Sequence, residues 1–164
     1  MALIAHMTIE GTNQGEITKG AGRLKGREDT VEVYAFEHTV GIPKDRQSGR
    51  IIGQRFHQPV VIVKEIDKTS PLLSQALVTA ETLKVRVDFW RFSPDGSGRQ
   101  EQFYTVELAN AQLVSSKQEL PFVKDPETAQ YPLLERLEIA FERISGTFQD
   151  GGIMYEDDWT NPVT

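Results

Sequence analysis

The sequence predicts an all-β fold, an antiparallel β-barrel with one flanking α-helix. Most apolar residues alternate with polar ones, as they do along half-buried strands. Two alternating segments change phase by one residue, which is what a bulge produces where a strand bends around a barrel. One segment alone has helical spacing. With 164 residues and 38% hydrophobic content, the chain is expected to form a single domain, residues 1–164, around one core.

The predicted strands begin at the N-terminus and recur along the chain. In residues 1–10, the apolar residues stand at alternate positions. The same alternation marks residues 31–36, 83–89 and 137–142, and phase changes fall within 104–113 and 141–148. A turn at 94–98 separates two strands, and the turn Asp150-Gly151-Gly152 precedes a short last strand, 153–155.

The segment that begins at Ser70 departs from this period. Ser70 can cap a helix whose first position is Pro71, where the missing N–H is harmless. Five apolar residues then fall on one helical face: Leu72, Leu73, Ala76, Leu77 and Ala80. We therefore expect a short helix packed against the barrel.

Two connections are too long to be simple turns, because loops beyond roughly 12 to 15 residues are uncommon in compact domains and are usually functional or disordered. The second, 118–132, contains three prolines. The first, 41–58, is basic and also carries Ile51, Ile52 and Phe56. Bulky apolar side chains on a solvated segment indicate a surface that a partner covers.

Composition excludes several classes of function. A membrane-spanning helix needs roughly 18 apolar residues, whereas the longest obvious apolar run is Val60–Val63. The N-terminal strand pattern does not resemble a signal peptide. A net charge of -6 argues against a protein that coats nucleic acid, which requires an excess of Lys and Arg. The chain has no cysteine, so packing alone must stabilise the fold in any compartment.

Catalytic and metal-binding patterns are not found in the sequence. The three histidines, His6, His38 and His57, lack the spacing of a metal site. Strand carboxylates such as Glu101 and Glu107 are typical of a wetted face, and there is no recognisable nucleophile motif. We therefore expect neither enzymatic activity nor a cofactor.

Three groups of residues follow one another in a characteristic order. The first is Val31-Glu32-Val33 through Glu37-His38, and the last is Lys64-Glu65-Ile66-Asp67-Lys68-Thr69-Ser70-Pro71-Leu72. Between them stand Ser48-Gly49-Arg50, Gly53, Arg55, His57 and Pro59. In this order and spacing, and with the 150–152 turn and Trp159, the chain resembles the Hcp family (hemolysin-coregulated proteins), the tube proteins of bacterial type VI secretion systems.

The resemblance implies a β-barrel protomer with a flanking helix, six copies of which close into a hexameric ring. Such rings stack into the inner tube of a contractile secretion machine. The implied partners are further copies of the chain, a VgrG-like spike protein, a contractile sheath and small secreted effectors in the tube lumen. The implied location is the cytoplasm before assembly, followed by secretion through the same machine without a signal peptide.

A ring needs two different complementary patches on each protomer, and stacking needs two more. Interface cores favour aliphatic, aromatic and Arg side chains. The predicted interface residues are Lys44, Arg46, Arg50, Ile51, Ile52, Arg55, Phe56, Leu72, Leu77 and Trp90. We expect the basic members to face Glu156, Asp157 and Asp158 of a neighbouring protomer. Candidate lumen-facing residues are Glu32, Glu37 and Glu138.

Two alternatives remain open at the level of sequence. A phage-type or pyocin-type tail tube protein would share the physics of the ring but not the secretion. A monomeric ligand-binding barrel of the lipocalin type would use the two long loops to gate a cavity. Rings would support a tube protein, whereas a monomer with a bound small molecule would support the ligand-binding barrel.

Overall fold

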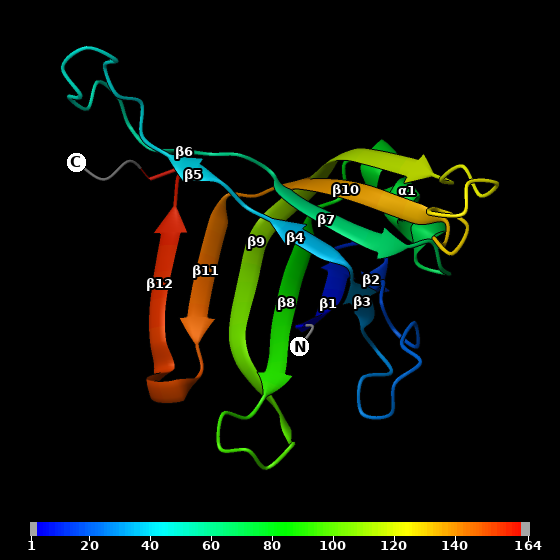
Figure 1. Cartoon of the computed structure of the whole chain (residues 1–164). Coiled ribbons are helices and arrows are strands. Elements are labelled where there is room, and N and C mark those ends of the chain that lie inside the picture. The colour runs from blue at the N-terminus through cyan, green and yellow to red at the C-terminus, as the bar shows by residue number, and fades with distance from the viewer. Residues whose placement is uncertain (1–2, 162–164) are drawn as a thin grey trace.

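The computed structural model describes residues 3–161, which form twelve strands, one α-helix and one 3-10 turn (Figure 1). The elements are β1 (Ile4–Gly11), β2 (Gly15–Glu16), β3 (Val31–Val33), β4 (Ala35–Glu37), β5 (Val40–Gly41), β6 (Phe56–His57), β7 (Val60–Glu65), α1 (Ser70–Val78), β8 (Leu83–Phe92), β9 (Gln100–Glu119), β10 (Leu134–Ala140), β11 (Arg143–Phe148), η1 (Asp150–Gly152) and β12 (Ile153–Asp158). The first two residues of the strand predicted over 1–10 lie outside the described part. Among residues 3–161, no helix has the length and apolar content needed to cross a membrane.

The strands form the predicted antiparallel barrel. The order β1-β8-β9-β10-β7-β4 makes the wall, and β3 pairs with β1 to close it. Residues 31–36 were predicted as one strand, and this is wrong. The chain bends at Tyr34, whose N–H donates to the Val63 carbonyl at 2.8 Å, so that β3 pairs with β1 while β4 pairs with β7. One short segment therefore joins the two edges of the sheet.

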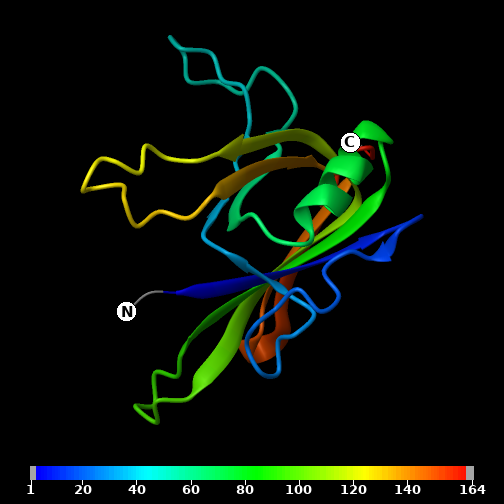
Figure 2. The same cartoon turned by 90° about the vertical axis from the view of Figure 1, so that its right-hand side faces the viewer.

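The longest strand, β9, belongs to both halves of the molecule (Figures 1 and 2). Its residues 104–109 pair with β11, and its residues 112–119 pair with β10. Between them, Asn110 has a φ of 49°, and the pairing with β8 shifts register nearby. The predicted phase change within 104–113 is thus confirmed as the place where β9 bends.

The other predicted phase change has a different cause. Residues 137–148 do not form one bulged strand, because the chain leaves the sheet at Phe141 and Glu142. β10 ends before this point and β11 begins after it, and each pairs with a different half of β9. β12 then folds back on β11 through the 150–152 turn, and it forms the edge of this part of the sheet.

Apolar side chains fill the interior of the barrel. They come from β1, β7, β8, β9, β10 and β11, and include Met7, Ile9, Val60, Ile62, Val85, Val87, Leu108, Leu137, Ile139 and Ile144. Each of these is almost completely buried. The interior is therefore a packed core, as expected for a small barrel.

The helix α1 covers one side of this core (Figure 2). Leu73 and Ala76 are buried in the core, and Leu77 packs against it, whereas Leu72 points outward. Pro71 occupies the first turn as predicted. The predicted cap is wrong: Thr69 holds the N-cap position, without a side-chain capping bond. The Ser70 hydroxyl instead donates a hydrogen bond to Glu135.

A buried ion pair attaches the start of the helix to the barrel. Lys64 on β7 and Glu135 on β10 are both 0% exposed, and their charged atoms lie 3.0 Å apart. The Lys64 ammonium also donates to Asp67 and to the Ser70 hydroxyl, each at 3.1 Å. Ser70 in turn donates to Glu135 at 2.7 Å. These bonds compensate the large cost of removing two charges from water.

Asp67 completes this network from the loop before α1. Its carboxylate accepts hydrogen bonds from the Thr69 N–H and hydroxyl, as well as from Lys64. Burial alone would raise the pKa of Asp67, but the Thr69 hydroxyl and the Lys64 ammonium outweigh it, so the pKa lies below its usual value.

We predict that Lys64→Met lowers the free energy of unfolding by about 3–5 kcal/mol, because it leaves the Glu135 carboxylate buried without its partner. The double variant Lys64→Met, Glu135→Leu removes both charges, so its free energy of unfolding should fall much less. Chemical denaturation of the two variants measures this difference. Equal losses in the single and double variants would contradict the ion-pair explanation.

Candidate subunit-interface surfaces

The first long loop forms an arm, residues 42–55, that projects away from the barrel (Figure 1). The two-residue strands β5 and β6 pair at its base. Farther out, Lys44 and Ile51 form an isolated bridge, and Ile52 N–H donates to the Pro43 carbonyl at 3.0 Å. The arm therefore has a defined hairpin-like backbone even though it stands clear of the core.

The tip of the arm is organised by Asp45. Its carboxylate accepts the N–H and hydroxyl of Ser48 at 2.6 and 2.7 Å, and these bonds lower its pKa. Gly49, with a φ of 69°, lets the chain turn back. The turn displays three exposed cations, Lys44, Arg46 and Arg50.

The apolar residues of the arm have two different roles. Ile51 and Ile52 are 69% and 67% exposed, so nothing in their own protomer covers them. Phe56 lies at the base, where its ring covers Gly41; a Cβ at position 41 would come within 2.9 Å of the ring. The two isoleucines therefore form an exposed apolar surface, whereas Phe56 also supports the base of the arm.

The base of the arm is bound to the C-terminal strand by charged and aromatic groups. Arg55 donates two hydrogen bonds of 2.6 Å to the Asp157 carboxylate on β12. His57 Nε2 lies 2.7 Å from the same carboxylate, and His57 Nδ1 lies 3.2 Å from His38 Nε2. Hydrogen bonds from Arg55, supported by His57, hold the pKa of Asp157 at about 2 against the opposing effect of burial.

This arrangement corrects one expectation from the sequence. Arg55 was expected to face the acidic residues of a neighbouring protomer, but its guanidinium is paired with Asp157 of its own chain. The two residues are about a hundred positions apart in the sequence, and folding brings them together where β12 passes the base of the arm. The cations at the tip of the arm, in contrast, remain exposed.

The remaining predicted interface residues are placed by the barrel. Leu72 is exposed on α1, while Leu77 packs against the core. Trp90 is half-buried on β8, and the Arg27 guanidinium lies 3.9 Å above its ring. Leu77 and Trp90 are therefore mainly supports within the protomer.

The three acidic residues predicted to face the lumen do not share one surface. Glu37 and Glu138 both align with Val61 on the intervening strand β7, so they lie in one row on the outer face of the barrel. Glu32 is on β3 and lines a different region. The structure brings together two of the three.

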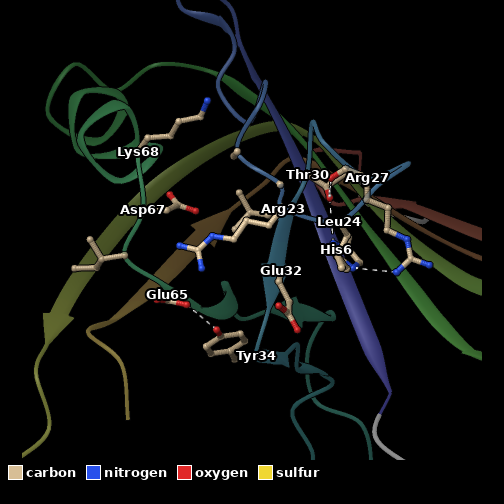
Figure 3. A pocket seen from close by; sticks show the side chains of 14 residues that line it. His6, Arg23, Leu24, Arg27, Thr30, Glu32, Tyr34, Glu65, Asp67 and Lys68 are labelled. Atoms are coloured by element: carbon tan, nitrogen blue, oxygen red, sulfur yellow. Dashed lines mark hydrogen bonds between the residues drawn. The ribbon is translucent and has the colours of Figure 1, made fainter. Parts of the chain in front are cut away.

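That different region is an open cavity of about 360 Å³ (Figure 3). It lies outside the barrel core, between the 21–30 loop and residues 65–68. Arg23 and Lys68 line it together with Glu32 and Asp67, so its wall carries both signs of charge. At one side Tyr34 donates to Glu65 at 2.9 Å, and burial together with this bond raises the pKa of Tyr34 to about 12.

Comparison with known proteins identifies the family. Residues 6–148 match the sequence model of the family described as "Type VI secretion system effector, Hcp". The chain belongs to the Hcp family. It is 42% identical to the "Major exported protein" of Pseudomonas aeruginosa, over 99% of both chains.

Solved Hcp structures have the same fold. A crystal structure of an Hcp protein matches with a TM-score of 0.90 at 29% identity, covering 96% of this chain and 98% of that one. The secreted protein Hcp3 from Pseudomonas aeruginosa matches with a TM-score of 0.79 at 37% identity, covering 96% and 99%. This Hcp chain is therefore a subunit of a type VI secretion tube, and the tail-tube and ligand-binding alternatives are not favoured.

Two further exposed apolar surfaces were missed by the sequence analysis. The first is β12, where the consecutive residues Ile153, Met154 and Tyr155 are all exposed, so both faces of this edge strand are apolar. The signal was an unbroken apolar triplet where a half-buried strand would alternate. The second lies on the loop after β9 and comprises Leu120, Phe122, Val123, Tyr131 and Leu133.

Gly146 on β11 sets the position of the β12 edge. It is buried opposite Tyr155, and an added Cβ would meet the Tyr104 hydroxyl and come within 2.6 Å of the Tyr155 ring. Only a glycine allows both rings to pack over this point.

We predict that Gly146→Ala destabilises the protein by about 1–3 kcal/mol, because the extra methyl group overpacks the two tyrosines. Chemical denaturation measures the loss, and hydrogen exchange should show it concentrated in β11 and β12. Ser145→Ala, at the neighbouring position, is the control and should lower the free energy of unfolding by less. An unchanged unfolding curve for Gly146→Ala would show that the rings can move aside.

Proposed function

We propose that this Hcp chain forms one domain whose copies close into hexameric rings, and that the rings stack through the arm. The observation that carries the stacking contact is the exposure of Ile51 and Ile52 on a segment with an ordered backbone. Burying two isoleucine side chains contributes about 1.5–3 kcal/mol each, which is enough to favour a contact repeated six times around a ring. The neighbouring ring is then aligned by its acidic residues, which would face the exposed cations Lys44, Arg46 and Arg50 at the tip of the arm.

We propose that ring closure uses two different ends of the same sheet. β12 lies at one end, and the 17–30 loop beside β1 and β3 lies at the other (Figure 1). The first end presents apolar Met154 and Tyr155 next to acidic Glu156. The second presents exposed Leu24 with the basic Arg23 and Lys25. A head-to-tail contact requires two such unlike and complementary surfaces.

The proposed biological role is transport through secretion of the tube itself. The relatives named "Major exported protein" and "Secreted protein Hcp3" support secretion of this chain as well. We propose that it is made in the cytoplasm, assembles there inside a contractile sheath, meets a VgrG-like spike at the tip, and leaves without a signal peptide. Small effectors would travel in the lumen, and a lumen-facing role for Glu32, Glu37 and Glu138 stays a prediction.

We predict that Ile51→Ser together with Ile52→Ser abolishes stacking but not ring formation. The free energy of unfolding of the protomer should change by no more than about 0.5 kcal/mol, because both side chains are solvent-exposed before assembly. Negative-stain microscopy counts stacked and single rings, and native mass spectrometry gives the ring size. Normal stacking by the double variant would refute the arm contact.

We predict that Met154→Arg prevents ring closure, because it buries an unpaired charge at the proposed contact between protomers. Native mass spectrometry should show mainly monomer where the wild-type protein gives hexamer. Val78→Arg is the matched control, since Val78 is similarly exposed on α1 outside both proposed ring contacts. A hexamer of Met154→Arg would place ring closure on another surface.

A further inference from the structure

A chain of three side chains crosses the base of the arm. His38 lies between β4 and β5 on the segment that leads into the arm, His57 lies on β6, which returns from it, and Asp157 lies on β12. The distances are 3.2 Å from His38 Nε2 to His57 Nδ1 and 2.7 Å from His57 Nε2 to Asp157 Oδ2. One carboxylate thus connects both strands of the arm to the C-terminal strand.

The geometry limits how many protons this chain can hold. His57 Nε2 faces a carboxylate and therefore carries a proton. Between His57 Nδ1 and His38 Nε2 there is room for one proton, since one nitrogen must donate and the other accept. If both imidazoles were fully protonated, two N–H groups would point at each other across 3.2 Å. The pair accommodates one positive charge but not two.

We propose that the Asp157–His57–His38 chain anchors the arm in its outward direction and releases it in acid, when the pair takes up more protons than the single site between the two rings can hold. This proposal rests on the proposed stacking role of the arm for its biological consequence: acid would loosen the contact between rings and leave each barrel folded. The anchoring itself is a property of the protomer.

Side-chain contacts are important here because the backbone contributes little to the attachment of the arm. β5 and β6 pair over two residues each, and Gln58 N–H adds one bond of 2.9 Å to the Thr39 carbonyl. Aromatic packing holds the imidazoles in place: their rings stack nearly parallel at 5.4 Å, Phe141 meets both edge-on, and Trp159 meets His57 edge-on. Loss of the histidine link would therefore leave the arm on a short ladder and on the Arg55–Asp157 pair.

The charges around the pair favour a switch in mildly acidic solution. Asp157 on β12 faces His57, and Arg55, immediately before β6, binds the same carboxylate, with Asp158 next along β12. Phe141 from the β10–β11 connection contributes no charge. Burial lowers the pKa of His38, and the neighbouring His57 lowers it further. With a pKa of about 2, Asp157 stays ionised throughout.

The sign of the pH effect follows from the lowered pKa of His38. The unfolded or released arm binds a proton on His38 more readily than the anchored arm does. The anchor is therefore at full strength above the ordinary histidine pKa of about 6.5. It weakens as the pH falls through that value toward the lower pKa of the anchored state.

The test is hydrogen exchange of peptides covering residues 38–58, measured by mass spectrometry on the full-length protein and corrected for the intrinsic rate at each pH. Asp157→Asn should raise exchange at the base of the arm about tenfold at pH 7.5, as expected for loss of a charge-assisted network. The wild-type protein should show a smaller rise in the same peptides between pH 7.5 and pH 5, because the Arg55–Asp157 bonds remain. Peptides from β8 should change little in either case.

His38→Gln separates titration from structure, because glutamine can still donate to His57 Nδ1 but cannot gain a charge. It should keep slow exchange at pH 7.5 and lose the rise at pH 5. Asp95→Asn, in the distant β8–β9 turn, is the matched control and should behave as wild type. The proposal is overturned if wild-type exchange is unchanged at pH 5, or if His38→Gln retains the full rise.

Counting stacked rings at both pH values distinguishes this inference from the proposed function. If the arm is released at pH 5 while the rings remain stacked, the stacking role of the arm is wrong and the anchor stands. If the rings separate while exchange at the arm is unchanged, the anchor is wrong and another titratable contact controls stacking.

Discussion

The buried ion pair between Lys64 and Glu135 is the constraint on which the rest of the protomer depends. Two charges without solvent contact are tolerated only if every hydrogen-bonding direction is filled, and here the partners come from β7, β10 and the start of α1. The Ser116 hydroxyl on β9 also donates to the Glu135 carboxylate, at 3.3 Å, so four elements contribute to the network. Because a shift of the helix would withdraw the Ser70 hydroxyl from both buried charges, the network specifies one position for α1 over the barrel, and with it the packing of the core beneath.

The barrel closes with few residues, and this leaves much of the chain available for contacts outside it. Residues 31–37 join the two edges of the sheet, and the bend at Asn110 lets β9 serve both halves. The arm, the β12 edge and the loop after β9 then extend beyond the core with their apolar side chains exposed. In a monomer such surfaces would favour aggregation, whereas copies of a tube subunit can cover exposed apolar surfaces of this kind on one another.

The arm illustrates how an exposed segment can still be positioned accurately. Its own hydrogen bonds give it a shape, and Asp157 fixes its direction through Arg55 and His57. A contact repeated around a ring tolerates little variation between copies, because each misaligned arm reduces the area buried by the others. An anchor of charged groups supplies directionality that exposed isoleucines, whose attraction is non-directional, do not.

Local spacing, and the position of apolar residues on a solvated loop, were enough to predict the strand periodicity, the single helix, the bend in β9 and the exposure of Ile51 and Ile52. Three features could not be predicted in this way: residues 31–36 split at Tyr34, Ser70 binds the ion pair instead of capping the helix, and Arg55 binds Asp157 within the chain. Each depends on a partner far away in sequence, and local propensity contains no information about which distant carboxylate or carbonyl folding will bring into reach.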